Sequence, residues 1–282
     1  MAALMLAMAS AEGMGQELAP MGKDYEMIWH DEFDGSGPVD KNVWQFEHGF
    51  VRNEEYQWYQ EQNAYRQDGV LMLEGRMDSI PNPRYREGSR SWQEKRPYAR
   101  YSSASVNTRR TFSFLYGRME VRARIPAVIG SWPAIWTLGT KREWPSNGEI
   151  DIMEYYHVNG KPHILANVAW GNNQRYSAVW DSSRTPYEHF LEKDPYWGEK
   201  FHIWTMDWTK DYIRLYLDGE LLNETDLKNT INGSVGEHAN PFHSPQYILL
   251  NLAIGGINGG EPVADAFPMR YEVDYVRIYQ KK

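Results

Sequence analysis

Three acidic residues lie close together in the segment from Gly148 to Tyr155, which reads GEIDIMEY. Successive side chains of an extended strand alternate between its two faces, so Glu149 and Asp151 share one face and the isoleucines point to the other. Glu154 falls out of this phase, and one extra residue in a β-bulge brings it back to the acidic face. We therefore predict a bulged strand that presents three carboxylates on one side.

Three like charges on one strand face raise the pKa of at least one carboxyl group. The separation of an ionised acid from a protonated acid is what glycoside hydrolysis requires. Four strand steps span about 13 Å, and two glutamate side chains that lean together can approach the ~5–5.5 Å spacing of a retaining pair. A Ca²⁺ site and a solvated edge strand are the structural alternatives for this cluster.

The remaining chain is rich in short strand-like runs separated by Gly, Pro, Asn and Asp. In the run from Tyr116 to Pro126, apolar side chains alternate strictly with charged ones. Asp218-Gly219 between two apolar runs is typical of a hairpin, and only Glu188 to Lys193 suggests a helical turn or two. Many short strands with regular turns indicate a sandwich or barrel. The predicted strands cover residues 70–75, 116–126, 149–155, 203–208, 212–217, 247–254 and 271–279.

The composition fits a β-rich globular protein. Of the 282 residues, 41% are hydrophobic, and the net charge of -8 argues against nucleic acid as a partner. The absence of cysteine excludes disulfides and thiolate metal sites. The 12 tryptophans and 19 tyrosines suit either a β-rich core or a cleft whose rings stack on sugars.

The N-terminal stretch from Ala2 to Ser10 is a short run of small apolar residues that resembles the end of a signal peptide. We expect residues 1–22 to be a leader, a signal-peptide remnant or an added segment, and residues 25–282 to form a single domain. No apolar run of 18 or more residues follows, so the sequence predicts no membrane span. A secreted, periplasmic or cell-surface location is the corresponding prediction.

The sequence around the acids resembles glycoside hydrolase family 16, in particular its laminarinase-like (endo-β-1,3-glucanase-like) branch. GEIDIMEYY matches the family's E-x-D-x-x-E signature in its bulged form, and the other matching segments follow in family order. The resemblance implies a concanavalin-like β-jelly roll, a sandwich of two curved antiparallel sheets with a concave substrate cleft. The supporting segments are WHDEFDG (29–35), NEEYQWYQEQNA (53–64), YGRMEVRARIP (116–126), SWPAIWTLG (131–139), LNLAIGG (250–256) and YEVDYVRIYQ (271–280).

The resemblance also implies roles for individual residues. Glu149 would attack the anomeric carbon, Glu154 would act as the acid/base catalyst, and Asp151 would hold the nucleophile and separate the two glutamate pKa values. Candidate substrate-binding residues are those that match sugar-contacting positions or offer a stacking ring: Trp132, Trp136, Arg118, Asn53, Glu55, Trp144 and Trp170. The tryptophans have core packing as their structural alternative.

No cofactor is expected to be required for catalysis. Glu32 and Asp274 match terminal segments in which some relatives hold a structural Ca²⁺, so they are candidate calcium ligands. A surface aspartate and a buried capping glutamate are the alternatives for these two residues.

Two departures from the laminarinase-like pattern concern the substrate. Asn167 and Ala169 replace a Thr and a His that relatives usually carry after the catalytic strand, and the insertion from Asp78 to Arg100 adds a basic, aromatic stretch. Both are expected to border the cleft. The predicted activity is a retaining endo-acting hydrolysis either of β-1,3-glucan (laminarin type) or of galactose-containing glycans such as poly-N-acetyllactosamine and mucin-type O-glycans.

Two other functions share this fold. A non-catalytic carbohydrate-binding module needs the aromatic residues but not the carboxylates, and the carboxylate triplet is intact. A transglycosylase uses the same residues but lets a sugar resolve the intermediate, so the sequence leaves this alternative open. The expected partner is a polysaccharide or glycoprotein glycan, and the protein is expected to be a monomer.

Overall fold

The computed structural model describes residues 18–282. The expected leader over residues 1–22 therefore lies largely outside the described residues. Ahead of the first strand, the Leu18 amide donates to the Gly219 carbonyl at 2.9 Å. Between Leu18 and Lys282, no helix is both long and apolar enough to cross a bilayer.

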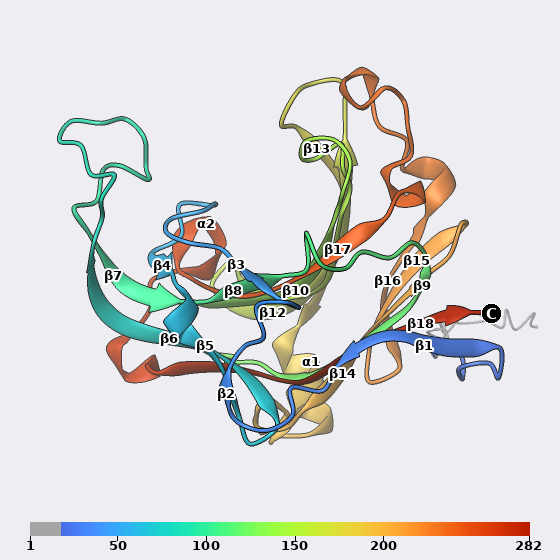
Figure 1. The fold of residues 1–282 in the computed structure, drawn as a ribbon, viewed down its shortest axis with the longest axis horizontal. Helices are drawn as coiled ribbons and strands as arrows, with labels where there is room; N and C mark the ends of the chain where they lie inside the picture. The colour runs from blue at the N-terminus through green and yellow to red at the C-terminus, as the bar shows by residue number, and fades with distance from the viewer. Residues whose placement is uncertain (1–17) are drawn as a thin grey trace, which may run out of the picture.

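Two antiparallel sheets form the molecule, as the jelly-roll prediction requires (Figure 1). One sheet has seven strands in the order β13-β12-β11-β10-β17-β8-β3. These strands are β3 (Gln45–Phe46), β8 (Ser105–Asn107), β10 (Ser131–Gly139), β11 (Glu149–Val158), β12 (Lys161–Gly171), β13 (Ala178–Pro186) and β17 (Gln246–Ile254).

The second sheet has eleven strands, and its main path runs β16-β15-β14-β9-β18-β6-β5-β2. Its members are β1 (Tyr25–Asp31), β2 (Gly37–Pro38), β4 (Gln57–Tyr59), β5 (Ala64–Gln67), β6 (Val70–Pro81), β7 (Tyr98–Ser103), β9 (Gly117–Arg124), β14 (His202–Trp208), β15 (Tyr212–Leu217), β16 (Glu220–Asp226) and β18 (Met269–Lys281). Helices are short: α1 (Tyr187–Lys193), α2 (Gly256–Gly259) and six single 3-10 turns among the described residues.

The predicted strands are all present in the structure, and several extend further than the sequence pattern indicated. The hairpin prediction is also confirmed, because Leu217 pairs directly with Glu220 across the two-residue turn Asp218-Gly219. Both turn residues have positive φ angles, +49° and +87°, which is the conformation that Asp-Gly favours in a two-residue hairpin. The predicted helical turn corresponds to α1.

The core lies between the two sheets and follows from the period-two patterning of the strands. Met119, Val121 and Ala123 of β9 are fully buried in it, as their alternation predicts, and Ile150 of β11 meets them from the other sheet. Burial of such side chains contributes about 1.5–3 kcal/mol each relative to exposure. This packing holds the seven-stranded sheet as a rigid floor for the residues on its other face.

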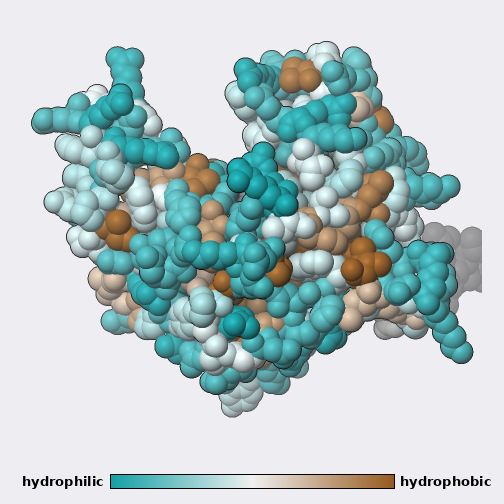
Figure 2. Space-filling model, viewed as in Figure 1, coloured by the Kyte–Doolittle hydropathy of each residue, from teal (hydrophilic) through white to brown (hydrophobic). Residues whose placement is uncertain are grey.

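The uncovered face of the seven-stranded sheet lies at the bottom of a cleft. Figure 2 shows the molecule hollowed between two raised lobes. One lobe carries the long β6–β7 hairpin with its loop 82–97, and the other carries β13 with the loops beside it (Figure 1). The inserted segment therefore forms one wall of the cleft region, as its sequence position predicted.

Candidate active site

The acidic strand β11 crosses the floor of the cleft and contains the predicted bulge. Across β12, Asp151 pairs with Asn167 and Glu154 pairs with Leu165, so two residues of β11 oppose one residue of β12. The same shift occurs against β10. The two bulge residues, Ile152 and Met153, are both buried in the core. The extra residue thus restores the phase of Glu154, and the three acids share the cleft face.

Indole and amide N–H groups hold the two glutamates. Trp132 Nε1 donates to Glu154 Oε1 at 2.8 Å, and Asn167 Nδ2 donates to Glu154 Oε2 at 2.9 Å. Trp144 Nε1 donates to Glu149 Oε2 at 2.5 Å. Since an indole N–H can only donate, each tryptophan fixes one carboxyl oxygen in a defined direction. Trp132 and Trp144 therefore contact the acids directly.

Burial and mutual charge push the acid pKa values upward. Burial raises the pKa of Glu154 to about 7, and the charge of Glu149 adds to the rise while the Trp132 hydrogen bond opposes it. Burial, together with the charges of Glu149 and Glu154, raises the pKa of Asp151 well above its usual range. Burial also raises the pKa of Glu149, against hydrogen bonds from Trp144 and Asp151.

These shifts define a charge state near neutral pH. Burial and the charges of Glu149 and Glu154 favour the protonated form of Asp151, and its interaction with Glu149 opposes the rise of the pKa of Glu149. The pKa of Glu154, about 7, allows this acid to give up and take back a proton near neutral pH. One ionised and one protonated glutamate on the same strand can carry out nucleophilic attack and proton donation.

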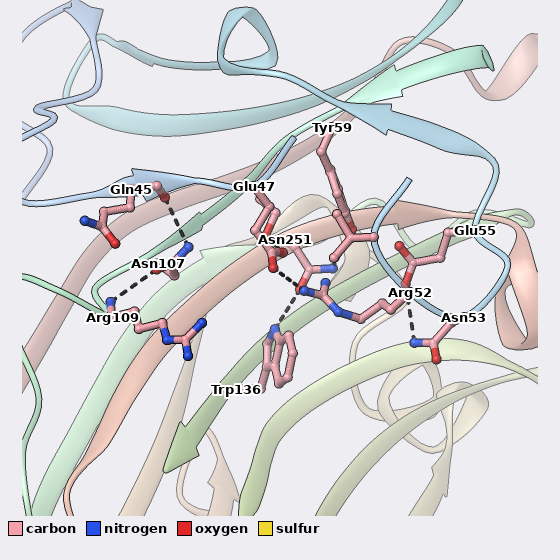
Figure 3. A network of polar contacts seen from close by, with 12 residues as sticks. Gln45, Glu47, Arg52, Asn53, Glu55, Tyr59, Asn107, Arg109, Trp136 and Asn251 are labelled. Atoms are coloured by element: carbon pink, nitrogen blue, oxygen red, sulfur yellow. Dashed lines mark hydrogen bonds and ion pairs between the residues drawn. The ribbon is translucent and has the colours of Figure 1, made fainter. Parts of the chain in front are cut away.

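An aromatic and arginine cluster lies on the β10 and β17 side of the acids, since Trp136 pairs with Asp151. Figure 3 shows its members Trp136, Arg52 and Asn251. Trp136 Nε1 donates to Asn251 Oδ1 at 2.7 Å, and the Arg52 guanidinium lies 5.1 Å from the centre of a Trp136 ring. Arg52 also forms an ion pair with Glu47. Burial works against the charge of Arg52, but Glu47 and Glu55 raise its pKa above the ordinary value. Trp136 thus lies on the cleft side rather than in the core between the sheets.

The Asn53 and Glu55 pair lies in the loop beside this cluster. Asn53 Nδ2 approaches Glu55 Oε1 at 3.4 Å, and Gln57 Nε2 donates to Glu55 Oε2 at 2.6 Å. Glu55 is buried and close enough to act on the pKa of Glu154 through its charge. The structure therefore brings Glu55 near Glu154, with Asn53 beside it, and the contact of these two residues with a sugar stays a prediction.

The assignment of Arg118 to the cleft is wrong. Arg118 lies on β9 of the eleven-stranded sheet, directly opposite Asp207 of β14. Its guanidinium donates to both Asp207 carboxylate oxygens, at 2.6 and 2.8 Å, and to the Ala19 carbonyl at 2.9 Å. Its neighbours in sequence face the core, so alternation directs Arg118 to the outer face of that sheet.

Trp170 is likewise not a sugar platform. It is 9% exposed and packs within the main core between the sheets. On β12, Asn167 and Ala169 lie opposite Asp151 and Glu149 and share their face. Trp170 follows Ala169 directly, so the period of two sends its ring to the other side of the strand.

Glu32 and Asp274 each have an arginine partner. Glu32 accepts from Arg277 at 2.7 and 2.9 Å, and Asp274 accepts from Arg122 at 2.5 Å. From residue 18 to the C-terminus, no three His, Asp or Glu side chains are grouped so as to hold a metal ion. These ion pairs supply the counter-charge for both carboxylates, and calcium binding stays a prediction.

Two residues at the site were not predicted from the sequence. Arg52 directly precedes the NEEYQWYQEQNA segment, and its position over Trp136 requires the loop before β4 to meet the distant strand β10. Trp180 of the edge strand β13 lies opposite Ala169, which itself lies opposite Glu149. Trp180 is 46% exposed on the acidic face. The alternation of β13 hints at its orientation, but only the strand pairing places it in line with Glu149.

Comparisons with known proteins agree with this geometry. The model of the glycosyl hydrolases family 16 matches residues 52–277. A "Beta-glucanase" of Rhodothermus marinus is 32% identical over 280 residues, which cover 95% of this chain and 89% of that protein. The "Glucan endo-1,3-beta-glucosidase A1" of Niallia circulans is also 32% identical, over 95% of this chain, and the match spans only 40% of its own length.

A solved structure has a TM-score of 0.81 and 33% sequence identity, and the match covers 93% of each chain. It comes from work on endo-acting O-glycanases that prominent members of the human gut microbiota express to initiate mucin breakdown. With the bulged acidic strand at the floor of a jelly-roll cleft, the chain belongs to family 16 of the glycosyl hydrolases, and its described residues form a retaining, endo-acting glycoside hydrolase domain.

Proposed function

We propose that Glu149 is the nucleophile and Glu154 the acid/base catalyst of a double displacement on a β-linked glycan. The observation that carries this proposal is the bulge, which places both glutamates on the cleft face with N–H donors fixing their oxygens. Asp151 donates a hydrogen bond to Glu149 and lowers its pKa relative to an unpaired buried glutamate.

In the first step, Glu149 attacks the anomeric carbon while the bond from that carbon to the bridging oxygen breaks. Glu154 gives its proton to the leaving oxygen, so the released chain departs as a neutral alcohol. In the second step, Glu154 takes a proton from water, and the oxygen of that water displaces Glu149 from the sugar. The anomeric configuration is inverted twice and therefore retained. The chain's own carboxyl groups supply every proton transfer, and no cofactor is required.

The glycan is either a β-1,3-glucan or a galactose-containing chain such as poly-N-acetyllactosamine or a mucin-type O-glycan. The floor of the cleft carries the residues that bear on this choice. Ala169, which has a small side chain, lies opposite Glu149, and Asn167 donates a hydrogen bond to Glu154. These are the positions that depart from the laminarinase-like pattern, and they adjoin the reacting groups.

Product analysis on a glycan panel tests this function. The panel contains laminarin, mixed-linkage glucan, agarose-type galactan, keratan and mucin glycans. We expect internal cleavage of at least one of them, with release of oligosaccharides whose new reducing ends first appear in the β configuration. Initial release of the α anomer, or binding without cleavage of every glycan, would contradict the proposal.

The wild-type pH profile follows from the acid pKa values. Glu154 must be protonated in the first step and its pKa is about 7, so kcat/KM should fall above about pH 7. Glu149 must be ionised, and because its pKa is raised above 4.5, activity should also fall on the acid side at a pH above 4.5. A bell-shaped profile of kcat/KM, which reports the free enzyme, is the expected result. An alkaline limb more than two pH units above 7 would contradict the role given to Glu154.

A substrate switch tests the two departures. The first change, Ala169→His, adds an imidazole opposite Glu149. The second replaces the loop 82–97 by Asn-Gly, a two-residue turn that joins β6 to β7 where Pro81 pairs with Tyr98. A site rejects an epimer mainly by leaving its own buried polar groups unpaired. We therefore expect the combined variant to shift the ratio of kcat/KM for β-1,3-glucan over galactose-containing glycan by roughly 10-fold or more towards glucan.

Each change is also made alone, because Arg96 of the loop donates to the Glu55 and Glu54 carbonyls at 2.7 and 2.9 Å. A melting curve checks that loss of these bonds leaves the fold intact. If wild type strongly prefers laminarin and the variants keep that preference, the departures have no effect on specificity.

We further propose that residues 1–22 are a leader, a signal-peptide remnant or an added segment, and that residues 25–282 are one domain. We also propose that the enzyme is secreted, periplasmic or at the cell surface and acts as a monomer. Support comes from the apolar N-terminal run and from strands that begin at Tyr25. N-terminal sequencing of exported protein and light scattering of the purified enzyme check these points. A retained leader or a dimer would count against them.

A further inference from the structure

A polar pocket of about 360 Å³ lies at one end of the concave sheet, and the catalytic mechanism does not use it. Its lining includes Gln45, Phe46, Asn107, Arg109, Arg110 and Tyr247. These residues come from β3, β8 and β17 and from the turn after β8. In the strand order, β8 lies three positions from β11, which corresponds to about 14 Å. Tyr247, on the near wall, lies two strands from Glu149, which corresponds to about 10 Å. The pocket is therefore reached by a sugar that lies along the cleft, away from the cleaved bond.

The two arginines of this pocket have no ion-pair partner. Within residues 18–282, neither Arg109 nor Arg110 has a carboxylate within 4.0 Å, although both are exposed. The acid on the pocket wall, Glu47, is already engaged, because it pairs with Arg52 and accepts from Ser105 Oγ at 2.6 Å. The pocket thus presents two positive groups on a chain whose net charge is -8.

The surrounding residues hold Arg109 towards the cleft (Figure 3). Asn107 Oδ1 accepts from the Arg109 backbone amide at 3.2 Å, and Asn107 Nδ2 approaches the Gln45 carbonyl at 3.4 Å. The Arg109 guanidinium lies 5.9 Å from the centre of the Tyr247 ring. Tyr247 belongs to the same apolar cluster as Trp136, on the sheet face that carries the acids. A glycan lying across that face would bring a distal sugar to the pocket.

We propose that this pocket is a subsite for an anionic substituent, a sulfate ester or a carboxylate, on a sugar distant from the cleaved bond. The inference rests on the proposed hydrolysis of a glycan in this cleft. Guanidinium groups bind oxyanions through paired, charge-assisted hydrogen bonds. Such bonds are needed here, because the acids and the overall negative charge repel an anionic glycan elsewhere on the protein. The subsite therefore selects for an anionic decoration while the catalytic acids cleave the neutral backbone.

The test compares three oligosaccharides that share one cleavable backbone: neutral, sulfated and sialylated. Wild type should cleave at least one anionic form more efficiently than the neutral one. Arg109→Ala/Arg110→Ala should lower kcat/KM for that form by about 10- to 100-fold, the range expected for lost charge-assisted hydrogen bonds, and leave the neutral substrate unchanged. The double variant Lys161→Ala/Lys210→Ala removes the same charge from the first residue of β12 and from the β14–β15 turn, and should behave as wild type.

The arginine variant also identifies the substituent. A fall in kcat/KM on the sulfated substrate indicates sulfate, and a fall on the sialylated substrate indicates carboxylate. The preference should also weaken between ~0.02 and ~0.5 M salt, because exposed charges are screened. Equal losses on the neutral and anionic substrates, or no anionic preference in wild type, would overturn the inference while the hydrolase assignment stands. If no glycan is cleaved, calorimetric binding to Glu149→Gln still decides the matter: arginine-dependent binding of the anionic oligosaccharides supports the subsite, and arginine-independent binding or none overturns it.

Discussion

Glu149→Gln should lower kcat/KM by more than about 10⁴-fold, because it removes the atom that attacks the anomeric carbon. The fold should survive, since glutamine fills the same volume and can still accept the Trp144 hydrogen bond. The measurement is kcat/KM on the best glycan of the panel, with a melting curve beside it. Glu192→Gln, an exposed glutamate on α1, is the matched control and should retain full activity.

Azide rescue distinguishes a nucleophile from a residue that merely supports the fold. In Glu149→Gly the carboxylate is replaced by space, and azide can attack the anomeric carbon from that side when the substrate carries a good leaving group. One displacement then occurs instead of two, so the glycosyl azide should have the anomeric configuration opposite to the substrate's. Rescue of this inverted type at Glu154 rather than at Glu149 would exchange the two roles.

Glu154→Ala should lower kcat/KM on natural glycans by about 10²- to 10⁴-fold, the usual contribution of a positioned general acid. For aryl glycosides, whose leaving groups need no proton, the rate of the first step should fall much less. Azide should then yield a product of retained configuration, because it attacks the glycosyl-enzyme that Glu149 forms. The alkaline limb near pH 7 should vanish from the profile, since the group responsible for it is absent.

The choice of substitution matters at Glu154. Both of its carboxyl oxygens accept N–H groups, from Trp132 and from Asn167. A glutamine would turn its own N–H₂ group towards one of these donors, so Glu154→Gln combines loss of the proton with a strained contact. Alanine avoids this clash. Glu154 is not the proton donor if Glu154→Ala keeps the alkaline limb of the pH profile, or if its kcat/KM falls equally on aryl and natural substrates.

The sequence by itself determined which side of each strand enters the core, because that choice follows from local alternation of apolar and polar residues. Met119, Val121 and Ala123 are buried as the pattern of β9 predicts. The same reasoning located the bulge, since three acids can share a face only if one residue is added between Asp151 and Glu154. The hairpin at Asp218-Gly219 was equally local, as backbone conformations with positive φ favour these residue types.

The tertiary structure decided which strands lie side by side, and therefore which polar faces meet the acids. The family resemblance put Arg118 among the sugar-binding residues, but β9 pairs with β14 in the eleven-stranded sheet, where Arg118 has Asp207 as its partner. Conversely, Trp180 lies in line with Glu149 across the sheet only because β13 pairs with β12. Arg52 reaches Trp136 only because a loop folds over β10.

The physical reason is the range of the interactions. Alternation depends on the geometry of a few consecutive residues, so the sequence carries it directly. Strand order, and the charges that it brings together, depend on contacts between residues far apart in the chain. The pKa of Glu154 illustrates this. Burial and the charge of Glu55, in the loop before β4, raise it, and hydrogen bonds from β10 and β12 lower it. The pocket formed by Arg109 and Tyr247 likewise exists only where β8 lies beside β17.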